Sequence, residues 1–276
     1  MSNYYVWLDA GHSKATPGKR NTKASPDFFE YEFNNDIAKK LKKRLEQHGI
    51  TVYLTNTTPT GADISLTTRA NRANTKWKAL GKPANSAFVS IHGNASSGAW
   101  ATARGVEVYH AGNASAKSKN LALLLTNQIY QDIKVIDSGF KNRGRKSANF
   151  TVIYKAQMPA VLIEHGFYDN QRDLKLMQNN RDVFVEADCK AICKHFGITY
   201  RAINEKKELM EPYLIKVIYP GADGLNVRKG PGTEYDTVTQ IHLNQVFTIV
   251  EEKNGWGKLK SGVGWISLNS KYVKEV

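Results

Sequence analysis

The sequence predicts an α/β fold, in which a twisted, mostly parallel β-sheet is flanked by helices and is followed by a small all-β barrel. Over residues 1–200, short apolar runs alternate with stretches of helical periodicity, as they do in parallel sheets covered by helices. From residue 213 onward only short β-type runs remain, separated by Gly-containing turns. In a chain of 276 residues, a hydrophobic share of 41% is enough to build a sizeable core.

The apolar runs define the expected strands, and the periodic stretches between them define the expected helices. The expected strands are residues 4–9, 51–55, 87–92, 105–110, 150–154 and 159–164. The expected helices cover about 26–48, 64–80, 115–134 and 170–196, and the first has Ser25 as its N-cap and Pro26 in its first turn.

Residues 201–212 are polar, balanced in charge and closed by Pro212, which indicates a linker. The sequence therefore predicts a first domain over residues 1–200, a linker over 201–212 and a second domain over 213–276.

Positive charge is concentrated in the first domain. The whole chain carries +14, and residues 1–200 hold 28 Lys and Arg against 16 Asp and Glu, whereas residues 213–276 hold 8 against 6. Such a surface favours a polyanionic partner, such as nucleic acid, an anionic wall polymer or a membrane surface, and charge alone does not choose among them. Residues 141–146 hold the densest group of basic side chains, which is interpreted as a solvated loop or as part of that surface.

Targeting features are not recognised in the sequence. No apolar stretch approaches the roughly 18 residues that a membrane helix needs, so membrane insertion is not expected. Residues 1–12 lack the basic start and the long apolar core of a secretory signal peptide, which favours a protein stored in the cytoplasm.

Two further patterns are interpreted as structural. Cys189 and Cys193 lie four residues apart on the apolar face of a predicted helix, and a two-Cys metal site would need partners that do not occur nearby in the sequence. The stretch GHSKATPGKR does not fit a phosphate-binding loop, because six residues separate Gly11 from Gly18 and Arg20 follows Lys19.

Two predicted strands end in a histidine beside a glycine. The run YVWL leads into Asp9, Ala10, Gly11 and His12, and the run FVSI leads into His92 and Gly93. A single histidine of this kind is more often structural than a ligand, but open α/β sheets bind ligands at the carboxyl ends of their strands. Two imidazoles at equivalent strand ends therefore favour a zinc site, which needs a third protein ligand.

Glu30 is the candidate for that third ligand. At about 100° per residue, Glu30 lies about 20° from Ile37 and Leu41 on the apolar face of the first helix, while Glu32 points away from it. A carboxylate on a buried face is costly unless it is paired or bound to metal. The alternative is a carboxylate that interacts with the amino end of the helix.

Glu164 follows four apolar residues at the end of the last predicted strand. A hydrolase that activates water on a metal needs a base that is not itself a ligand, and Glu164 suits that role. Alternation along the strand turns His165 to the opposite face, so His165 is a weaker candidate.

The set formed by DAGH, the helix-borne Glu30, SIHGNA and RGRKSANFTVIYKAQMPAVLIEHGFYDN resembles the zinc-dependent N-acetylmuramoyl-L-alanine amidase family, type 3, over residues 4 to about 198. The resemblance implies a phage endolysin or a bacterial autolysin. It implies cleavage of the amide between N-acetylmuramic acid and L-alanine in peptidoglycan by water that one Zn²⁺ ion activates.

The resemblance also assigns roles to residues. It places the zinc ligands on His12, Glu30 and His92 and the catalytic acid on Glu164, and the Ala that follows the acidic ligand by eight residues is Ala38, which selects Glu30. Asn94 is a weak candidate for additional contact with the substrate. The basic segment between His12 and Glu30 departs from the Gly-rich acidic loop frequent in the family, which affects substrate contacts.

The second domain resembles a bacterial SH3-type (SH3b) wall-binding module over about residues 213–276. The resemblance rests on GLNVRKGPGTEYDTVTQI and NGWGKLKSGVGWI. It implies that Tyr235, Trp256 or Trp265 could stack on glycan or peptide, although Trp265 in particular suits a small barrel core.

The expected partners are bacterial peptidoglycan and anionic wall polymers, and nucleic acid is not expected. An endolysin of this kind would stay in the cytoplasm until lysis and would then act on the wall. Two alternatives remain open: a zinc peptidase that cuts the stem peptide, and a non-enzymatic binder of wall or nucleic acid.

Overall fold

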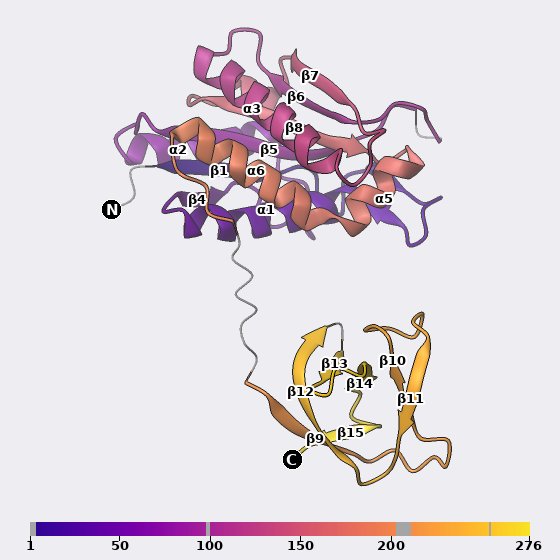
Figure 1. Cartoon of the computed structure of the whole chain (residues 1–276). Coiled ribbons are helices and arrows are strands. Elements are labelled where there is room, and N and C mark those ends of the chain that lie inside the picture. The colour runs from indigo at the N-terminus through magenta and orange to yellow at the C-terminus, as the bar shows by residue number, and fades with distance from the viewer. Residues whose placement is uncertain (1–3, 98–99, 203–210, 254) are drawn as a thin grey trace. The chain divides into compact units, whose positions relative to one another are not determined.

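The computed structural model describes residues 4–97, 100–202, 211–253 and 255–276. The chain divides into two compact units, Met1–Tyr200 and Arg201–Val276 (Figure 1). Each unit has its own hydrophobic core. Of the expected linker 201–212, only residues 201–202 and 211–212 are among the described residues. None of the helices in the described ranges has the length and hydropathy needed to cross a bilayer.

The α/β unit is built on a six-stranded sheet of order β4-β1-β5-β8-β6-β7. Its strands are β1 (Tyr5–Ala10), β4 (Thr51–Leu54), β5 (Ser86–Asn94), β6 (Val106–His110), β7 (Asn142–Ser147) and β8 (Ala160–Phe167). Strands β4, β1, β5 and β8 are parallel, β6 runs antiparallel to β8, and β7 runs parallel to β6. The predicted α/β fold with a mostly parallel sheet is confirmed. A separate short pair joins β2 (Arg20–Asn21) to β3 (Phe28–Phe29).

Helices cover both faces of this sheet. They are α1 (Glu30–Gln47), α2 (Leu66–Ala79), α3 (Ala116–Ile133), α4 (Thr151–Tyr154), α5 (Gln171–Asn179) and α6 (Arg181–Phe196). Alternate residues of β1 separate the two sides: Val6 and Leu8 belong to the large core with α1, α3 and α6, whereas Trp7 belongs to a smaller core with α2 and α4. Because both faces are covered, the central strands are apolar almost throughout.

The predicted strand over residues 150–154 is wrong, because this segment forms helix α4, Thr151–Tyr154. Val152 and Ile153 are buried in the core that contains Trp7 and Phe88. A short apolar run is compatible with either a buried strand or a buried helical turn, so its periodicity could not decide between them.

Two helix boundaries also differ from the prediction. The first helix begins at Glu30 with Phe29 as its N-cap and no capping side chain, because Phe28 and Phe29 pair with residues 20–21 instead. Ser25 is therefore not the N-cap. The single helix predicted over 170–196 is two helices, α5 and α6, which meet at Asn180.

The basic residues 141–146 do not form a solvated loop. Residues Asn142–Ser147 form β7, the edge strand of the sheet, which pairs with β6. Two cations of this strand, Arg143 and Lys146, donate hydrogen bonds to the buried carboxylate of Glu107. The sequence pattern does not show this contact.

The second unit is a seven-stranded antiparallel sheet of order β11-β10-β14-β13-β12-β9-β15. Its strands are β9 (Tyr213–Val217), β10 (Leu225–Arg228), β11 (Thr237–Ile241), β12 (Val246–Lys253), β13 (Trp256–Leu259), β14 (Trp265–Ser267) and β15 (Val273–Glu275). A compact aliphatic core that includes Val217, Val227, Ile249 and Ile266 lies inside it. The expected all-β second unit is confirmed.

Candidate active site

Ionisable side chains that could take part in catalysis lie along one edge of the six-stranded sheet. His12 follows β1, His92 lies near the end of β5, and Glu164 lies in β8 directly beside His92 in the parallel register. Glu30 opens α1, which packs against β1 and β5. Because parallel strands end at the same edge, residues far apart in the sequence are brought together.

His12, Glu30 and His92 form a group with the geometry of a metal site. One ligand atom from each lies within 4.8 Å of the other two. Glu30 Oε1 lies 3.3 Å from His12 Nε2 and 3.1 Å from His92 Nδ1. Zinc bonds to nitrogen and oxygen of 2.0–2.1 Å give a tetrahedral ligand separation of about 3.3 Å, so these spacings fit.

The environment of Glu30 also fits a bound cation. The side chain is 1% exposed, and its second oxygen, Oε2, is buried without a hydrogen-bond partner among the described residues. An unpaired buried carboxylate oxygen is costly, and coordination to a metal would satisfy it. Two imidazoles and one carboxylate are a donor set that zinc prefers.

The backbone between β1 and the metal group is shaped to bring the two histidines together. His12 has a φ of 63°, a conformation that is uncommon for a residue with a side chain. A Cβ atom on Gly11 would lie 2.1 Å from His92 Cε1, so only glycine leaves room for the His92 ring. The two rings meet edge to face with centroids 4.9 Å apart.

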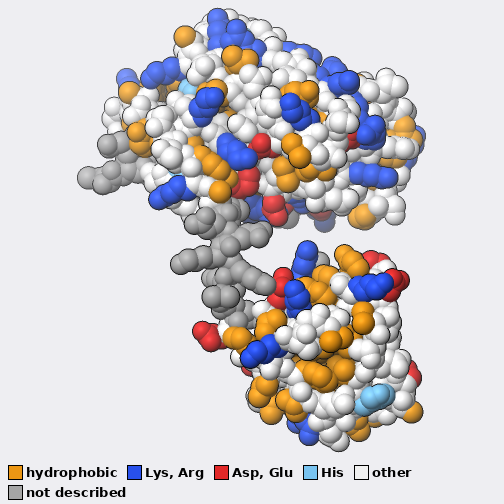
Figure 2. All heavy atoms as spheres, in the orientation of Figure 1, with side chains coloured by type: hydrophobic (Ala, Val, Ile, Leu, Met, Phe, Trp, Pro, Cys, Tyr) orange, Lys and Arg blue, Asp and Glu red, His pale blue; other side chains and the backbone are white. Residues whose placement is uncertain are grey.

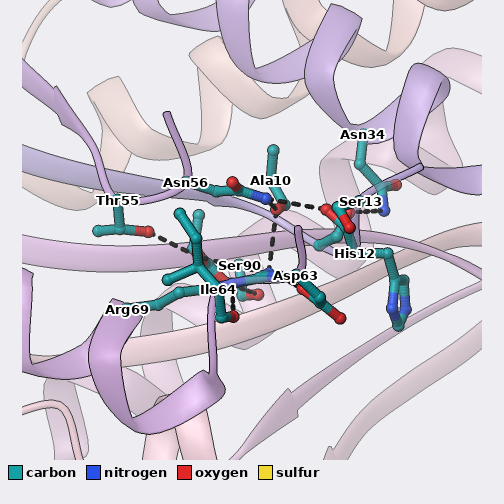
Figure 3. Close-up of polar contacts among 12 residues, drawn as sticks. Ala10, His12, Ser13, Asn34, Thr55, Asn56, Asp63, Ile64, Arg69 and Ser90 are labelled. Carbon is teal, nitrogen blue, oxygen red and sulfur yellow. Dashed lines mark hydrogen bonds and ion pairs between the residues drawn. The ribbon is translucent and has the colours of Figure 1, made fainter. Parts of the chain in front are cut away.

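A hydrogen-bond network holds this turn from three sides (Figure 3). Asn34 Nδ2 donates to the Gly11 carbonyl at 3.0 Å, and Asn56 Nδ2 donates to the carbonyls of Ala10 and His12 at 2.8 Å each. Arg69 donates to the Ala10 carbonyl at 3.2 Å. Such contacts behind a ligand fix its orientation, which is how sites of this kind gain metal affinity.

Asp9 belongs to this support and is not among the grouped ligands. It is fully buried and accepts hydrogen bonds from Thr55 Oγ1 at 2.6 Å and Ser90 Oγ at 2.8 Å. The buried Arg69 lies 3.8 Å from its carboxylate. Alternation along β1 directs Asp9 to the same side as Trp7.

The charges of His12, Glu30 and His92 affect one another. Burial alone would raise the pKa of Glu30, but hydrogen bonds and charge attraction from His12 and His92 outweigh burial and hold that pKa far below its usual range. Burial lowers the pKa of His92, against the opposing pull of Glu30. An ionised carboxylate beside a neutral imidazole is the state that metal binding requires.

Glu164 has the opposite electrostatic environment. Burial first, and then repulsion from Glu30 and Glu107, raise the pKa of Glu164 well above its usual value. Its Oε2 is buried and has no hydrogen-bond partner in the part of the chain that the structure describes. A carboxyl group of this kind, beside a metal group but outside it, can take up and release a proton.

His165 lies on the other face of β8. Its ring is fully buried, with Nε2 at 2.9 Å from Asp188 Oδ2 and Nδ1 at 3.2 Å from the His92 carbonyl. Its contacts support the backbone of His92, and they leave no imidazole nitrogen directed at the metal group.

Glu107 is a site residue that the sequence reasoning missed. It lies in β6 directly across from Glu164, and it is 3% exposed. Asn94, a candidate for substrate contact, donates its amide to Glu107 Oε1 at 2.9 Å and accepts from the Ala95 N–H at 2.8 Å. The available signal was an acid between Val106 and Val108 in an otherwise apolar strand.

A second group of potential ligands lies at the far end of α1. One ligand atom each from His48, Cys189 and Cys193 lie within 4.8 Å of one another, and all three residues are buried. The sequence reasoning found no partner for the two cysteines, because His48 is distant in the sequence and reaches them only through the packing of α1 against α6.

The aromatic candidates of the β unit fall in different places. Trp256 lines a groove together with Tyr219, Tyr272 and Arg228. Tyr235 is 42% exposed and packs over Gly230, outside the groove lining, and Trp265 is 8% exposed. The groove thus includes only one of the three aromatic residues considered from the sequence.

Family models match both units of the chain. The model described as N-acetylmuramoyl-L-alanine amidase matches residues 6–194, and the model described as bacterial SH3 domain matches residues 223–274.

Individual relatives agree with these matches. The endolysin of Bacillus phage SPP1 is 34% identical over 180 residues, which are 63% of this chain and 59% of that protein. The N-acetylmuramoyl-L-alanine amidase CwlM of Bacillus licheniformis is 30% identical over 77% of this chain and 74% of its own length.

Solved structures show the same likeness for the first unit. The crystal structure of N-acetylmuramoyl-L-alanine amidase from Clostridium difficile 630 aligns with a TM-score of 0.61 at 30% identity and covers 71% of this chain and 98% of its own. The catalytic domain of CwlV from Bacillus (Paenibacillus) polymyxa aligns with a TM-score of 0.58 at 25% identity, over 71% of this chain and 99% of its own.

Proposed function

The chain belongs to the N-acetylmuramoyl-L-alanine amidase family, and from that membership we propose that it hydrolyses the amide between N-acetylmuramic acid and L-alanine in bacterial peptidoglycan. The observation that carries the proposal is the convergence of His12, Glu30 and His92, with the separate acid Glu164 on the strand beside His92. Non-enzymatic binding would require neither the group of three nor the acid.

His12, Glu30 and His92 would hold one zinc ion. When bound there, zinc supplies a Lewis acid that activates water and polarises the substrate carbonyl. The buried and ionised Glu30, the neutral His92 and the constrained turn at His12 prepare the chain for this ion.

Glu164 would move the proton. It takes a proton from water as the water oxygen forms a bond to the carbonyl carbon. It then delivers that proton to the alanine nitrogen as the C–N bond breaks. The hydroxyl of the water thus remains on the carbonyl carbon, and its proton is on the released amine.

The β unit would hold the enzyme on the wall. A groove that combines Trp256, two tyrosines and Arg228 is suited to a peptide or glycan segment with apolar and polar parts. The α/β unit, whose Lys and Arg side chains are spread over the face shown in Figure 2, would add attraction to anionic wall polymers. Salt should therefore weaken binding to whole walls more than it slows cleavage of soluble substrates.

The experiment compares wild type with Glu164→Gln on purified walls and identifies the amino groups that appear. We expect new amino termini on L-alanine and a loss of activity of about 10³-fold in the variant with its zinc retained. New amino groups inside the stem peptide would identify a peptidase instead. Lysis that survives in Glu164→Gln would exclude the role given to Glu164.

A further inference from the structure

Beyond Glu164, the row of functional side chains continues onto the last two strands of the sheet. Glu107 on β6 accepts hydrogen bonds from Arg143 Nε at 2.6 Å, Lys146 Nζ at 2.5 Å, Tyr109 Oη at 2.7 Å and Asn94 Nδ2 at 2.9 Å. A buried ion pair of this kind is not explained by stability alone, because apolar residues of similar volume often stabilise a fold equally well or better.

A β-bulge places both cations on the side of Glu107. Val106 pairs with Asn142, but Val108 pairs with Arg145, so β7 has one extra residue at this point. Gly144, with a φ of 80°, lies in the bulge. Arg143 and Lys146 both reach Glu107, whereas Arg145 follows Val108 to the opposite face and donates to the Lys119 carbonyl of α3.

The result is a cationic pair that is bound to one shared carboxylate but is still open to solvent. The side chains of Arg143 and Lys146 are 33% and 36% exposed, while the side chain of Glu107 beneath them is buried. The guanidinium of Arg143 also lies over the ring of Phe167 at 4.8 Å. Two positive charges on one negative charge leave the group with a net charge of +1 that faces outward.

This pair lies close to the reacting groups. Glu107 and Glu164 are directly opposite in the antiparallel register, where Cβ atoms are about 4.5–5.5 Å apart. An extended peptide advances about 3.3–3.6 Å per residue. A peptide whose amide lies at Glu164 can therefore place its first or second residue at the cations.

We propose that Arg143 and Lys146 form a subsite for a carboxylate of the substrate peptide, on the residue that follows L-alanine, the second beyond the cleaved amide. Glu107 is the positioning residue that holds both cations, and Asn94 acts through Glu107. The planar guanidinium is suited to a carboxylate, which it binds through paired N–H groups. The inference rests on the proposed amidase function and names the feature of the peptide that this enzyme would select.

The test uses two soluble muramoyl peptides that differ in one group. In one, the residue after L-alanine carries a free carboxylate; in the other, it carries the primary amide. For wild type we expect kcat/KM to be at least about tenfold higher on the carboxylate form, mainly through a lower KM.

Variants locate the effect on the cationic pair. Arg143→Gln and Lys146→Gln should each raise KM for the carboxylate form by about tenfold and change the amide form by less than about threefold. Arg143→Lys should recover part of the loss. Arg145→Gln is the matched control, because Arg145 lies on the same strand but on the opposite face, and it should change neither substrate. Thermal unfolding of each variant checks folding, and Lys146→Gln alone carries the test if Arg143→Gln does not fold.

Three results would overturn the proposal. Wild type could cleave both substrates equally. Arg143→Gln could lower kcat equally on both, which indicates a structural role. Both variants could keep their kinetics on soluble substrates and lose activity only on walls, which assigns the cations to a phosphate polymer. Wild type that cleaves neither peptide contradicts the amidase function itself, so the two failures are distinguishable.

Discussion

Helix α1 begins at Glu30, beside His12 and His92, and ends just before His48, which lies beside Cys189 and Cys193. With 18 residues at 1.5 Å each, the two groups are about 27 Å apart. Both bring three potential metal ligands to within 4.8 Å. Proximity of the ligand atoms alone therefore does not decide which of the two groups binds a metal.

At the first end, the surroundings prepare the ligands for a metal. Glu30 is ionised and keeps one buried oxygen without a partner among the described residues, and a constrained turn directs His12. At the far end, a neighbouring thiol and burial raise the pKa of Cys189, which keeps it protonated. His48 Nδ1 lies 2.8 Å from the Arg44 carbonyl, and its ring stacks on Tyr200. Because the first group has the unpartnered Glu30 oxygen and lies beside Glu164, we infer that it binds metal and that the second group is part of the core packing.

The largest expected effect is at Glu30. Glu30→Gln keeps the size of the side chain but removes the charge that two histidines surround, so we expect bound zinc to fall from one ion per chain to below about 0.1. Wall lysis should fall by more than about 10³-fold. Metal analysis after dialysis and a lysis assay measure both, and Glu32→Gln on the exposed side of the same turn is the control. Full zinc content in Glu30→Gln would place the metal elsewhere.

A smaller effect is expected behind the ligands. Asn56→Ala removes two hydrogen bonds to the carbonyls of Ala10 and His12 and should weaken zinc affinity by about 10–100-fold. Competition with a chelator measures this, and excess zinc should restore most of the activity. Asn74→Ala is a matched control, because Asn74 also bridges two backbone groups, at Lys155 and Gln157, away from the metal group. Equal zinc affinity in the two variants would show that the turn needs no support from Asn56.

At the far end of α1, the effect should be on stability alone. Cys189→Ala removes a fully buried sulfur that packs 3.7 Å from His48 Nδ1. We expect a loss of about 1–2 kcal/mol in the free energy of unfolding, from lost packing. Zinc content and lysis should stay within about twofold of wild type. A loss of one zinc equivalent in this variant would show that the two ends of α1 are alike.

The grouping of His12, Glu30 and His92 could be predicted from the sequence because each of these residues carries a local signal. His12 and His92 stand beside glycines at strand ends, and Glu30 stands on the apolar face of a periodic helix. The fold class followed from the same alternation of patterns. Pairing, however, depends on contacts distant in the sequence. The approach of His48 to Cys189, and the attraction of Arg143 to Glu107, arise only when α6 packs on α1 and when β7 pairs with β6.

Short segments were the other difficulty. Residues 150–154 have the composition of a strand, but Thr151–Tyr154 form α4, because a short apolar run fits a buried helical turn as well as a buried strand. The start of α1 was misplaced for a related reason: Ser25 and Pro26 are good helix-start residues, but Phe28 and Phe29 are held by their pairing with β2. Tertiary contacts outweighed local preference in both places.

The smallest expected effect concerns His195, which lies in the last turn of α6, the helix that carries both cysteines. Burial, and then repulsion from Lys117, lower the pKa of His195 from 6.5 to about 4. The unfolded chain therefore binds this proton first as the pH falls. The contribution of His195 to the free energy of unfolding should be constant above about pH 6.5 and should decline between about pH 6.5 and 4. Below about pH 4 this group should cause no further decline.

The predicted share of His195 in that decline is on the order of 1 kcal/mol, because the ring is only partly buried and solvent reduces the effect. His195→Gln should flatten the pH dependence of unfolding over this range without any change in zinc content. Denaturant unfolding at several pH values measures it, with the exposed His242→Gln as the control. If the pH dependence of unfolding is unchanged in His195→Gln, groups other than His195 cause the decline between about pH 6.5 and 4. A loss of zinc in His195→Gln would show that the C-terminal end of α6 affects the site formed by His12, Glu30 and His92.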